Sequence, residues 1–401
     1  MKILMLTPYL PYPLLSGGQI RTYNLLKQLS EKHQVTLFSL IKDPDETKYI
    51  PELLQFCEDV RVFQRSKTPF TLWNIAKTAV SSYPFLVIRN YVSEVTQAIE
   101  QELKRTNFDL LHAETFYMMP HLPQTKTPII LVEQTIEYLG YESYAKQAFP
   151  LLRPLLNLDI AKIKRWETYY WEQADQLIVM SEQDKDFIKR KTQAKNDIAV
   201  VANGVDANWF SEKPKVRHAD PTVLFVGTFK WLPNREAVRF LVHKVWPHIL
   251  SSLPKAKLHI VGNGPTDEIR NFETQYPNII VKSRVEDIRD AFAVADVLVA
   301  PVFSGKGTRY KVLEAMASGT PLVATPTAVE GLHLRENTHV LIGKTGKELA
   351  DQTLLLLKSK ELRAKLAQAS KLFVQKNFDW QSISTQLDII YRRIGASNEN
   401  K

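Results

Sequence analysis

Short apolar runs alternate with longer amphipathic stretches along almost the whole chain. Uniformly apolar runs of this length are typical of strands that are buried on both faces of a sheet. We expect such strands at 3–6, 35–40, 60–63, 108–112, 128–132, 177–180, 198–201, 223–226, 257–261, 279–281, 297–301, 322–324 and 340–342. Helical spacing of apolar residues predicts helices between and after them, at 19–32, 68–106, 144–173, 234–250, 285–294, 346–358, 361–377 and 379–394. Strands that alternate with helices predict an α/β fold with parallel sheets covered on both faces.

The pattern divides into two series. The polar stretch 211–221 contains Pro214 and Pro221 and separates them. We therefore expect two doubly wound domains, 1–205 and 206–378, facing each other across a cleft lined by strand carboxyl ends.

A strand, a glycine-containing loop and a helix follow one another near residue 300. The strand 297–301 leads into Gly305, Lys306 and Gly307, and Thr308 can cap a helix that ends before Gly319. A helix amino terminus offers free N–H groups and a positive dipole end to an anion, usually a phosphate.

Two charged residues of this helix lie three positions apart. Lys311 can neutralise a phosphate, and Glu314 can accept hydrogen bonds from two vicinal hydroxyls, as on a ribose. The alternative is an exposed lysine–glutamate pair with no role in binding.

The first half offers a second set of candidates. Gly18, in the pair Gly17–Gly18 at the start of the first helix, is either part of an anion site or part of a tight turn. Arg21, one turn later, either faces a phosphate or is an ordinary surface arginine. The polar residues His112, Glu133 and Gln134 end two strands, where open α/β sheets place ligand groups, although His112 could be a hydrogen-bonded core histidine.

Composition narrows the choice of partner. The 401 residues carry a net charge of +9, which suits an anionic partner, but no nucleic-acid-binding signature is present. One cysteine, Cys57, excludes an internal disulfide, and a buried thiol in a reducing compartment is expected. We see no signal peptide or membrane-spanning run and expect a cytoplasmic protein. The basic, aromatic-rich stretch 144–173 leaves two alternatives, packing on the sheet, which we favour, or peripheral contact with an anionic membrane at its inner face.

Several motifs resemble family 4 of the glycosyltransferases, in the right order and over nearly the whole chain. These are Gly17–Gly18, "NGVD" from Asn203, "VLFVGTFKWLPN" from Val223, "HIVGNGP" from His259, "VEDIRDAFAVADVLVAP" from Val285, "GKGTRYKVLEAMASGTPLVAT" from Gly305 and "FDW" from Phe378. The resemblance implies a GT-B fold of two Rossmann-like domains, in which the last helix, about 379–395, packs back onto the first domain. It implies an acceptor site in the first domain and a nucleotide-sugar site in the second.

The resemblance also implies roles for individual residues. Glu314 would bind the ribose, Lys311 would lie near the diphosphate, and Gly18 would approach the phosphates from the first domain. The amides around Gly305, Gly307 and Thr308 would hold the diphosphate, and Arg284 and Val285 would lie near the base. The implied reaction transfers a sugar with retention of configuration, without a metal or other cofactor, to a glycan, glycolipid or other hydroxyl acceptor in bacterial cell-surface polysaccharide synthesis.

Three positions depart from the family pattern. Lys306 stands where a glutamate is common, and we group it with Lys311 and Glu314 as the catalytic candidates. After Gly227, many members have an arginine and a lysine, whereas the nearest equivalents here are Thr228 and Asn234. Lys230 or Lys306 could supply the positive charge of the missing pair. Gln134 stands where many members have a histidine, next to the carboxyl group of Glu133.

These departures leave alternatives open. A non-catalytic scaffold or sensor that binds nucleotide sugar is the main one. A metal-dependent transferase would use an Asp-x-Asp pair, and Asp43 with Asp45, or Asp184 with Asp186, has that spacing. A dehydrogenase is disfavoured because no Gly-x-Gly-x-x-Gly follows the first strand.

Overall fold

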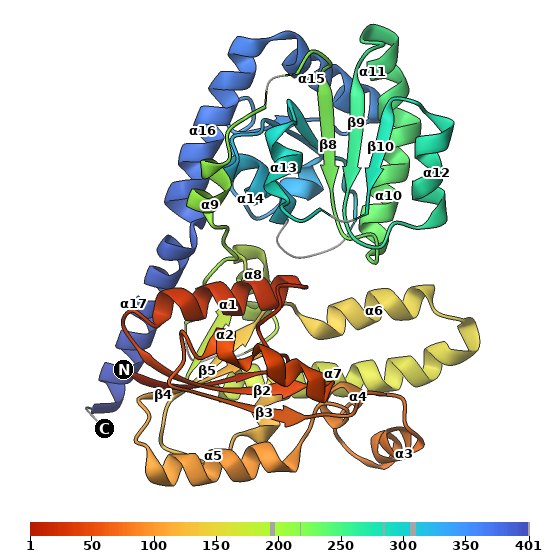
Figure 1. The fold of residues 1–401 in the computed structure, drawn as a ribbon. Coiled ribbons are helices and arrows are strands. Elements are labelled where there is room, and N and C mark those ends of the chain that lie inside the picture. Colours follow the sequence, from red (N-terminus) through yellow and green to blue (C-terminus); the bar gives the residue numbers. More distant parts are fainter. Residues whose placement is uncertain (193–196, 217, 284, 305–309, 400–401) are drawn as a thin grey trace. The chain divides into compact units, whose positions relative to one another are not determined.

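The protein consists of two compact units. The computed structural model describes residues 1–192, 197–216, 218–283, 285–304 and 310–399. Unit 1 comprises Met1–Ala202 and Ile383–Lys401, and unit 2 comprises Asn203–Ser382. Each unit is built on one parallel sheet, as the alternation of apolar runs and helices predicts (Figure 1).

Unit 1 has a seven-stranded sheet in the order β3-β2-β1-β4-β5-β6-β7. The strands are β1 (Lys2–Thr7), β2 (Gln34–Ile41), β3 (Asp59–Gln64), β4 (Leu110–Glu114), β5 (Ile129–Glu133), β6 (Gln176–Val179) and β7 (Ile198–Val200). Its helices include α1 (Gly17–Leu29), α2 (Ile50–Leu53), α3 (Leu72–Val80), α4 (Phe85–Ile88), α5 (Ser93–Arg105), α6 (Glu137–Gln147), α7 (Arg153–Gln173) and α8 (Glu182–Lys189). Helices α1 and α5 lie on opposite sides of this sheet (Figure 1). The strand order reverses between β1 and β4, which makes their carboxyl ends the switch point of this unit.

Unit 2 has a six-stranded sheet in the order β10-β9-β8-β11-β12-β13. The strands are β8 (Thr222–Val226), β9 (Lys257–Val261), β10 (Ile279–Lys282), β11 (Val297–Ala300), β12 (Leu322–Ala324) and β13 (Leu341–Ile342). The helices are α9 (Ala207–Glu212), α10 (Leu232–Phe240), α11 (Trp246–Ser252), α12 (Asp267–Gln275), α13 (Arg289–Ala293), α14 (Tyr310–Ala317), α15 (Gly346–Lys358) and α16 (Lys360–Phe378). Here the strand order reverses between β8 and β11.

The last helix, α17 (Trp380–Glu399), begins in unit 2 and ends in unit 1. Its buried residues Leu387 and Tyr391 belong to the core of unit 1. The Tyr391 hydroxyl is 2.6 Å from Nδ1 of His112, and Asp388 is 3.0 Å from Nε2 of His33. The sheet of unit 1 is therefore supported by the end of the chain.

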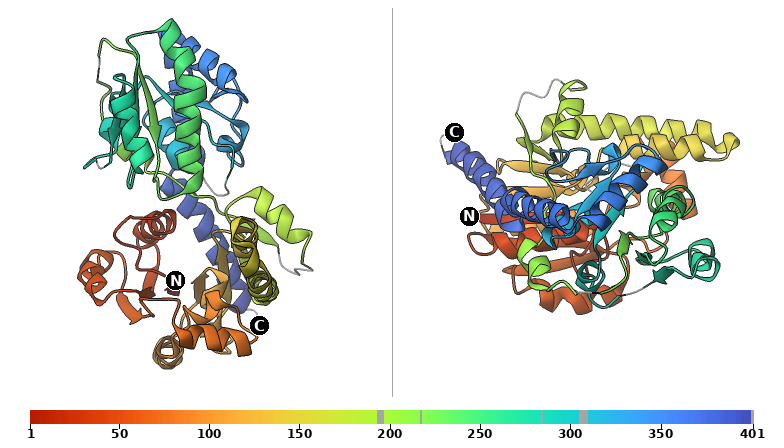
Figure 2. Two further views of the ribbon diagram at one scale, coloured as in Figure 1. Left: turned by 90° about the vertical axis from the view of Figure 1, so that its right-hand side faces the viewer. Right: turned by 90° about the horizontal axis from the view of Figure 1, so that it is seen from above.

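Some sequence-based boundaries are wrong. The stretch 144–173 is not one helix, because α6 ends at Gln147 and α7 starts at Arg153, with Pro150 and Pro154 at the junction. The resulting hairpin of two adjacent helices is visible in Figure 2. The helix expected at 234–250 is confirmed as a continuous helical stretch in which α10 and α11 flank a π-helical turn at Leu241–Val245, whereas the helix expected at 285–294 is reduced to α13.

The expectations for Cys57 and Gly319 are confirmed. Cys57 is a buried free thiol, and burial raises its pKa to about 12. Gly319 adopts φ = +66° two residues after the end of α14, as expected for a residue that ends a helix. Among the described residues, no helix combines the length and the apolar character that crossing a bilayer requires.

Candidate functional site

The loops after β8 and β9 pack tightly at the switch point of unit 2. Gly262 has φ = +154°, and a Cβ atom there would lie 1.8 Å from the carbonyl oxygen of Gly227. A Cβ atom on Gly227 would lie 2.9 Å from the side chain of Asn234. Neither position has room for a side chain, so only glycine allows the two loops to approach each other this closely.

Lys311, in the first turn of α14, is held next to the loop after β8 by Asn234. It is only 8% exposed, and its ammonium group donates a hydrogen bond of 2.7 Å to Oδ1 of Asn234. The same ammonium lies 4.3 Å from the centre of the Phe225 ring, at a distance typical of a cation–π contact. The alternative of an exposed surface pair is wrong for Lys311, because its positive charge is buried and fixed.

Glu314 follows one turn later on α14 and is half-buried. Removal from water raises the pKa of its carboxyl group to about 7, and the charge of Lys311 opposes part of this rise. A ligand that donates hydrogen bonds to the carboxylate would stabilise its ionised form. Lys311 and Glu314 together are therefore chemically suited to bind a ligand that carries hydroxyl groups near a negative charge.

The other donor-side candidates are placed less tightly. Thr228 accepts a 2.9 Å hydrogen bond from Nδ2 of Asn234 through its carbonyl oxygen, and Lys230 is exposed. Val285 is half-buried after β10. The remaining donor-side candidates, Arg284, Gly305, Lys306, Gly307 and Thr308, lie outside the described residues.

A hydrogen-bonded network occupies the switch point of unit 1. Gln134, directly after β5, donates through Nε2 to the Tyr9 hydroxyl at 2.7 Å and to Oε2 of Glu114 at 2.8 Å. Glu114, at the end of β4, is 3.1 Å from Nε2 of His112. A Cβ atom on Gly18 would lie 2.4 Å from the Tyr9 hydroxyl and 2.7 Å from Oε1 of Gln134. The structure therefore places Gly18 and Gln134, two of the predicted residues, side by side.

Glu114 is the fixed negative charge of this network. Burial alone would raise the pKa of its carboxyl group, but the hydrogen bond and charge of His112 and the charge of Arg21 lower it below its ordinary value. Arg21 is 1% exposed and donates through Nη1 to the carbonyl oxygen of Ala202 at 2.7 Å. Arg21 is therefore not the surface arginine that the sequence left open.

Two of the acceptor-side candidates lie in the protein interior. His112 is in the middle of β4, fully buried, with Tyr391 and Glu114 at its two ring nitrogens, as the core-histidine alternative requires. Glu133 is 2% exposed and accepts a 3.1 Å hydrogen bond from Nε1 of Trp171. Burial, followed by repulsion from Glu167 and Glu137, raises the pKa of Glu133 well above its ordinary value.

The sequence analysis missed two arginines close to this edge of the sheet. Arg65 directly follows β3 and donates to Oδ1 of Asn90, and Arg89 follows α4, with Nη2 3.4 Å from the hydroxyl of Tyr141. The Nε atoms of both arginines are buried and have no hydrogen-bond partner among the described residues. Burial lowers the pKa of the Arg65 guanidinium and the charge of Arg89 contributes to the shift, whereas Tyr117 and Glu46 oppose it. Arg65 could have been found by the strand-end rule, whereas nothing in the sequence singles out Arg89.

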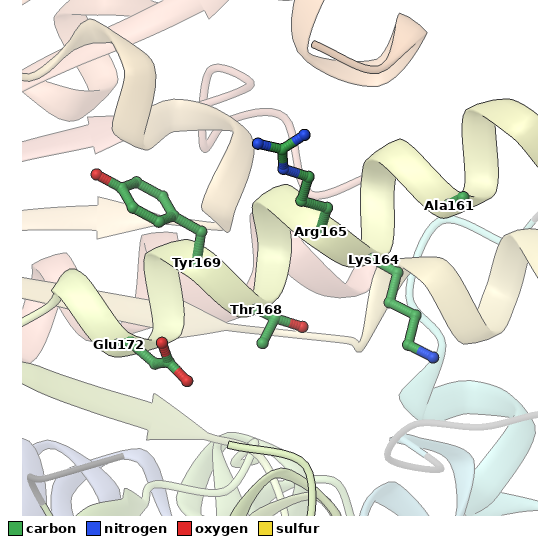
Figure 3. Close-up of a pocket in the computed structure, with 6 residues that line it drawn as sticks. All are labelled: Ala161, Lys164, Arg165, Thr168, Tyr169 and Glu172. Carbon is green, nitrogen blue, oxygen red and sulfur yellow. The ribbon is translucent and has the colours of Figure 1, made fainter. Parts of the chain in front are cut away.

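A shallow depression on α7 is a weaker candidate. It is lined by Ala161, Lys164, Arg165, Thr168, Tyr169 and Glu172 (Figure 3). All six residues come from one helix, and the labelled side chains of Lys164 and Arg165 point away from each other. A binding site normally needs walls from more than one element, so we do not treat this depression as a site.

The Asp-x-Asp pairs do not form a metal centre in the part of the chain that the structure describes. Asp43 caps a short 3₁₀ helix and binds the ammonium group of Lys67 at 2.5 Å. Asp184 accepts a 2.7 Å hydrogen bond from the Ser181 hydroxyl at the start of α8. Over these residues, no group of three or more histidine, cysteine, aspartate or glutamate side chains is arranged to hold a metal ion.

Comparisons with known proteins agree with this architecture. Residues 15–209 match the model of Glycosyltransferase Family 4, and residues 220–359 match that of Glycosyl transferases group 1. The phosphatidyl-myo-inositol mannosyltransferase of Mycobacterium leprae is 27% identical over 210 residues, which are 50% of this chain and 55% of the mannosyltransferase. The match thus spans about half the length of that relative.

Solved structures share the fold over the whole chain. Sucrose-phosphate synthase from Thermosynechococcus elongatus has a TM-score of 0.73 at 18% identity, covering 99% of this chain and 100% of that one. HepE from Anabaena, solved in complex with UDP and glucose, has a TM-score of 0.65 at 16% identity, covering 98% and 100%. The predicted GT-B fold is confirmed, and with the two family models this leads to one conclusion: the chain belongs to the group 1 glycosyltransferases of glycosyltransferase family 4.

Proposed function

We propose that this chain transfers a sugar from a nucleotide-diphosphate sugar to a hydroxyl acceptor, with retention of configuration and without a metal or other cofactor. The observation that carries the proposal is the buried ammonium group of Lys311, fixed by Asn234 one helical turn before the carboxyl group of Glu314. The activity of the mycobacterial relative, a mannosyltransferase, and the UDP and glucose bound to HepE support the same class of reaction.

In this proposal the residues of unit 2 bind the donor. Glu314 accepts hydrogen bonds from the ribose hydroxyls, and Lys311 neutralises charge on the diphosphate. Lys306 and the amides of Gly305, Gly307 and Thr308 complete the phosphate site by resemblance to the family. Fixed positive charges of this kind are most effective when the sugar–phosphate bond breaks, because the leaving diphosphate then gains negative charge.

The acceptor binds to unit 1 near Gln134 in this proposal. Glutamine cannot act as a base, but its amide can hydrogen-bond a sugar hydroxyl. As the acceptor oxygen bonds to the anomeric carbon, the bond from that carbon to the diphosphate breaks, and the departing diphosphate takes the acceptor proton. We place this reaction in the cytoplasm, which agrees with the single reduced thiol of Cys57, and in the synthesis of a bacterial surface glycan or glycolipid.

We further propose that the acceptor carries an anionic group that binds to Arg65 and Arg89. The charge of Arg89 helps to lower the pKa of the Arg65 guanidinium, and an anionic group bound beside both would relieve this repulsion in addition to the nearby carboxyl groups of Glu46 and Glu137. The buried Nε donors of both arginines have no described partner, and arginine binds phosphate and carboxylate through paired N–H groups. A phosphate-bearing sugar or lipid fits this pair better than a neutral glycan.

A nucleotide panel tests the proposal. The unfolding temperature of the wild type and of Glu314→Ala is measured with UDP, GDP, ADP and TDP, and donor turnover is then measured with the corresponding sugar conjugates. We expect one nucleotide to stabilise the wild type, by roughly 2.7 kcal/mol at about a hundred times its dissociation constant, and to lose this effect in Glu314→Ala. Binding of a donor that no acceptor turns over would favour the scaffold alternative, and no binding at all would reject both.

A further inference from the structure

Helix α3 exposes its apolar residues instead of burying them. Six of the residues in its sequence, LWNIAKTAV, are apolar, but none of its residues is buried. Leu72 is 87% exposed, Trp73 is 68% exposed and Val80 is 89% exposed. A short helix in water normally depends on packing of its apolar face, so this face is expected to have a partner.

The turn of the α6–α7 hairpin also exposes apolar residues. Leu151 is 81% exposed, and Leu155 and Leu158 are each 67% exposed. The guanidinium group of Arg153 donates to the carbonyl oxygens of Lys146 and Ala148, which fixes the backbone of the turn. The hairpin therefore presents its leucines on an ordered turn.

Hydrogen bonds connect α3 and α7. Lys162 on α7 donates through Nζ to the carbonyl oxygens of Thr78 at 2.6 Å and Ser81 at 2.7 Å. Trp166 donates through Nε1 to the carbonyl oxygen of Ser82 at 2.8 Å. In Figure 1, α3 and the end of the hairpin lie on the same side of unit 1. We call their exposed apolar residues the docking face: Phe70, Leu72, Trp73, Ile75, Val80, Tyr144, Phe149, Leu151, Leu152, Leu155 and Leu158.

The charged side chains within the docking face are basic, and the half-buried carboxyl groups of Glu142 and Asp159 lie at its border. Residues 68–81 and 143–158 contain Lys77, Lys146 and Arg153 but no aspartate or glutamate. All three basic residues are exposed, and the Lys77 ammonium lies 5.0 Å from the centre of the Trp73 ring. Protruding leucines and aromatic rings among basic residues match the boundary between lipid headgroups and acyl chains, where anionic lipids attract lysine and arginine.

We propose that the docking face binds the surface of an anionic lipid bilayer, with its leucines and aromatic rings inserted below the headgroups. The occupant we assign is the bilayer and not a second copy of the chain or another protein. This assignment goes beyond glycosyl transfer and does not depend on it. It answers the question that the sequence left open for 144–173: from Ile160 onward α7 buries residues such as Ile163 and Trp171, whereas its first turns and the preceding loop are free to reach lipid.

Vesicle sedimentation with the full-length chain tests this assignment. Vesicles of phosphatidylcholine alone are compared with vesicles containing 30% phosphatidylglycerol, at low and high salt. Two triple variants remove apolar residues, Leu72→Ser with Trp73→Ser and Val80→Ser, and Leu151→Ser with Leu155→Ser and Leu158→Ser. The matched control is a triple variant at exposed apolar residues elsewhere, Leu355→Ser with Leu372→Ser and Ile389→Ser, which are 49%, 61% and 62% exposed.

We expect the wild type and the control to bind the anionic vesicles more strongly than the neutral ones, and to bind less at high salt. Each triple variant of the docking face should lose at least tenfold in partitioning while keeping the wild-type unfolding temperature. Equal binding by these two variants, or no preference for the anionic vesicles, would overturn the proposal. So would a dimer in light scattering that these two variants convert to a monomer, because the docking face would then be a protein interface.

Discussion

The side-chain amide of Asn234 uses both of its polar atoms to position Lys311. Its oxygen accepts a 2.7 Å hydrogen bond from the Lys311 ammonium, and its nitrogen donates a 2.9 Å hydrogen bond to the carbonyl oxygen of Thr228. The amide thereby ties α14 to the loop after β8. The ammonium group is held in place by a residue on another element of the same unit.

Replacing Asn234 by alanine should weaken donor binding without unfolding the chain. A hydrogen bond to a charged group is worth about 1.5–3 kcal/mol, so we expect the dissociation constant of the bound nucleoside diphosphate to rise about tenfold or more. Titration calorimetry measures this constant. Asn271→Ala, at an exposed position on α12, is the control. A change of less than twofold would show that Lys311 does not need Asn234 to act on the phosphates.

Glu314 should make stability depend on pH near neutrality. The folded chain retains the Glu314 proton up to about pH 7, whereas the unfolded chain loses it near pH 4.5. The free energy of unfolding should therefore fall as the pH rises from about 4.5 to 7, by up to about 3 kcal/mol. Urea unfolding of the wild type and of Glu314→Gln measures the difference. The hypothesis fails if the two proteins show the same pH dependence.

The same titration should affect donor binding in the opposite direction. The ionised carboxylate accepts the ribose hydroxyls best, so affinity for the nucleotide should increase about tenfold between pH 6 and pH 8. Glu314→Gln corrects for the titration of the phosphate itself, because it should show only that part of the pH dependence. An identical increase in both proteins would exclude Glu314 from nucleotide binding.

Gly18→Ala and Gly140→Ala form a matched pair in unit 1. A Cβ atom at Gly18 would lie 2.4 Å from the Tyr9 hydroxyl, whereas nothing lies within 4 Å of one at Gly140. We expect Gly18→Ala to reduce the free energy of unfolding by about 1–3 kcal/mol and to lower transfer activity. Gly140→Ala, within α6, should be neutral or stabilise by about 0.5–1 kcal/mol. Similar effects of the two substitutions would mean that the Tyr9–Gln134 network readily adapts.

Arg89→Gln tests the anionic acceptor. We expect kcat/KM to fall at least tenfold with a sugar phosphate as acceptor, and to change little with the corresponding free sugar. The KM for the donor should stay constant. Arg105→Gln, at an exposed position in the last turn of α5, controls for the loss of a positive charge. Equal losses with both acceptors would assign Arg89 a structural role only.

The strands could be predicted from the sequence because burial on both faces requires uninterrupted apolar runs. The apolar spacing predicts α15 with its observed bounds, and in the structure Thr345 accepts a hydrogen bond from the backbone N–H of Glu348 and caps this helix. The hairpin of α6 and α7 was missed although Pro150 and Pro154 were visible, because the aromatic and basic residues on both sides suggested a single helix.

The side chains of the site were harder to predict than the elements that carry them. Helical spacing placed Lys311 and Glu314 near each other, but the burial of Lys311 depends on Asn234 and Phe225, which are distant in the sequence. The position of the Glu133 carboxyl group depends on Trp171, a residue of α7 that donates a hydrogen bond to it. Such contacts between elements leave no periodic signal in the chain.

The contribution of α17 to unit 1 has a consequence for how the protein is made. The core of this unit includes Leu387 and Tyr391, which the ribosome adds only after all of unit 2 has been synthesised. A nascent chain that stops before residue 383 leaves His112 and His33 without Tyr391 and Asp388. Unit 1 is thus translated first but completed last, and translation that ends early leaves its core without the residues of α17.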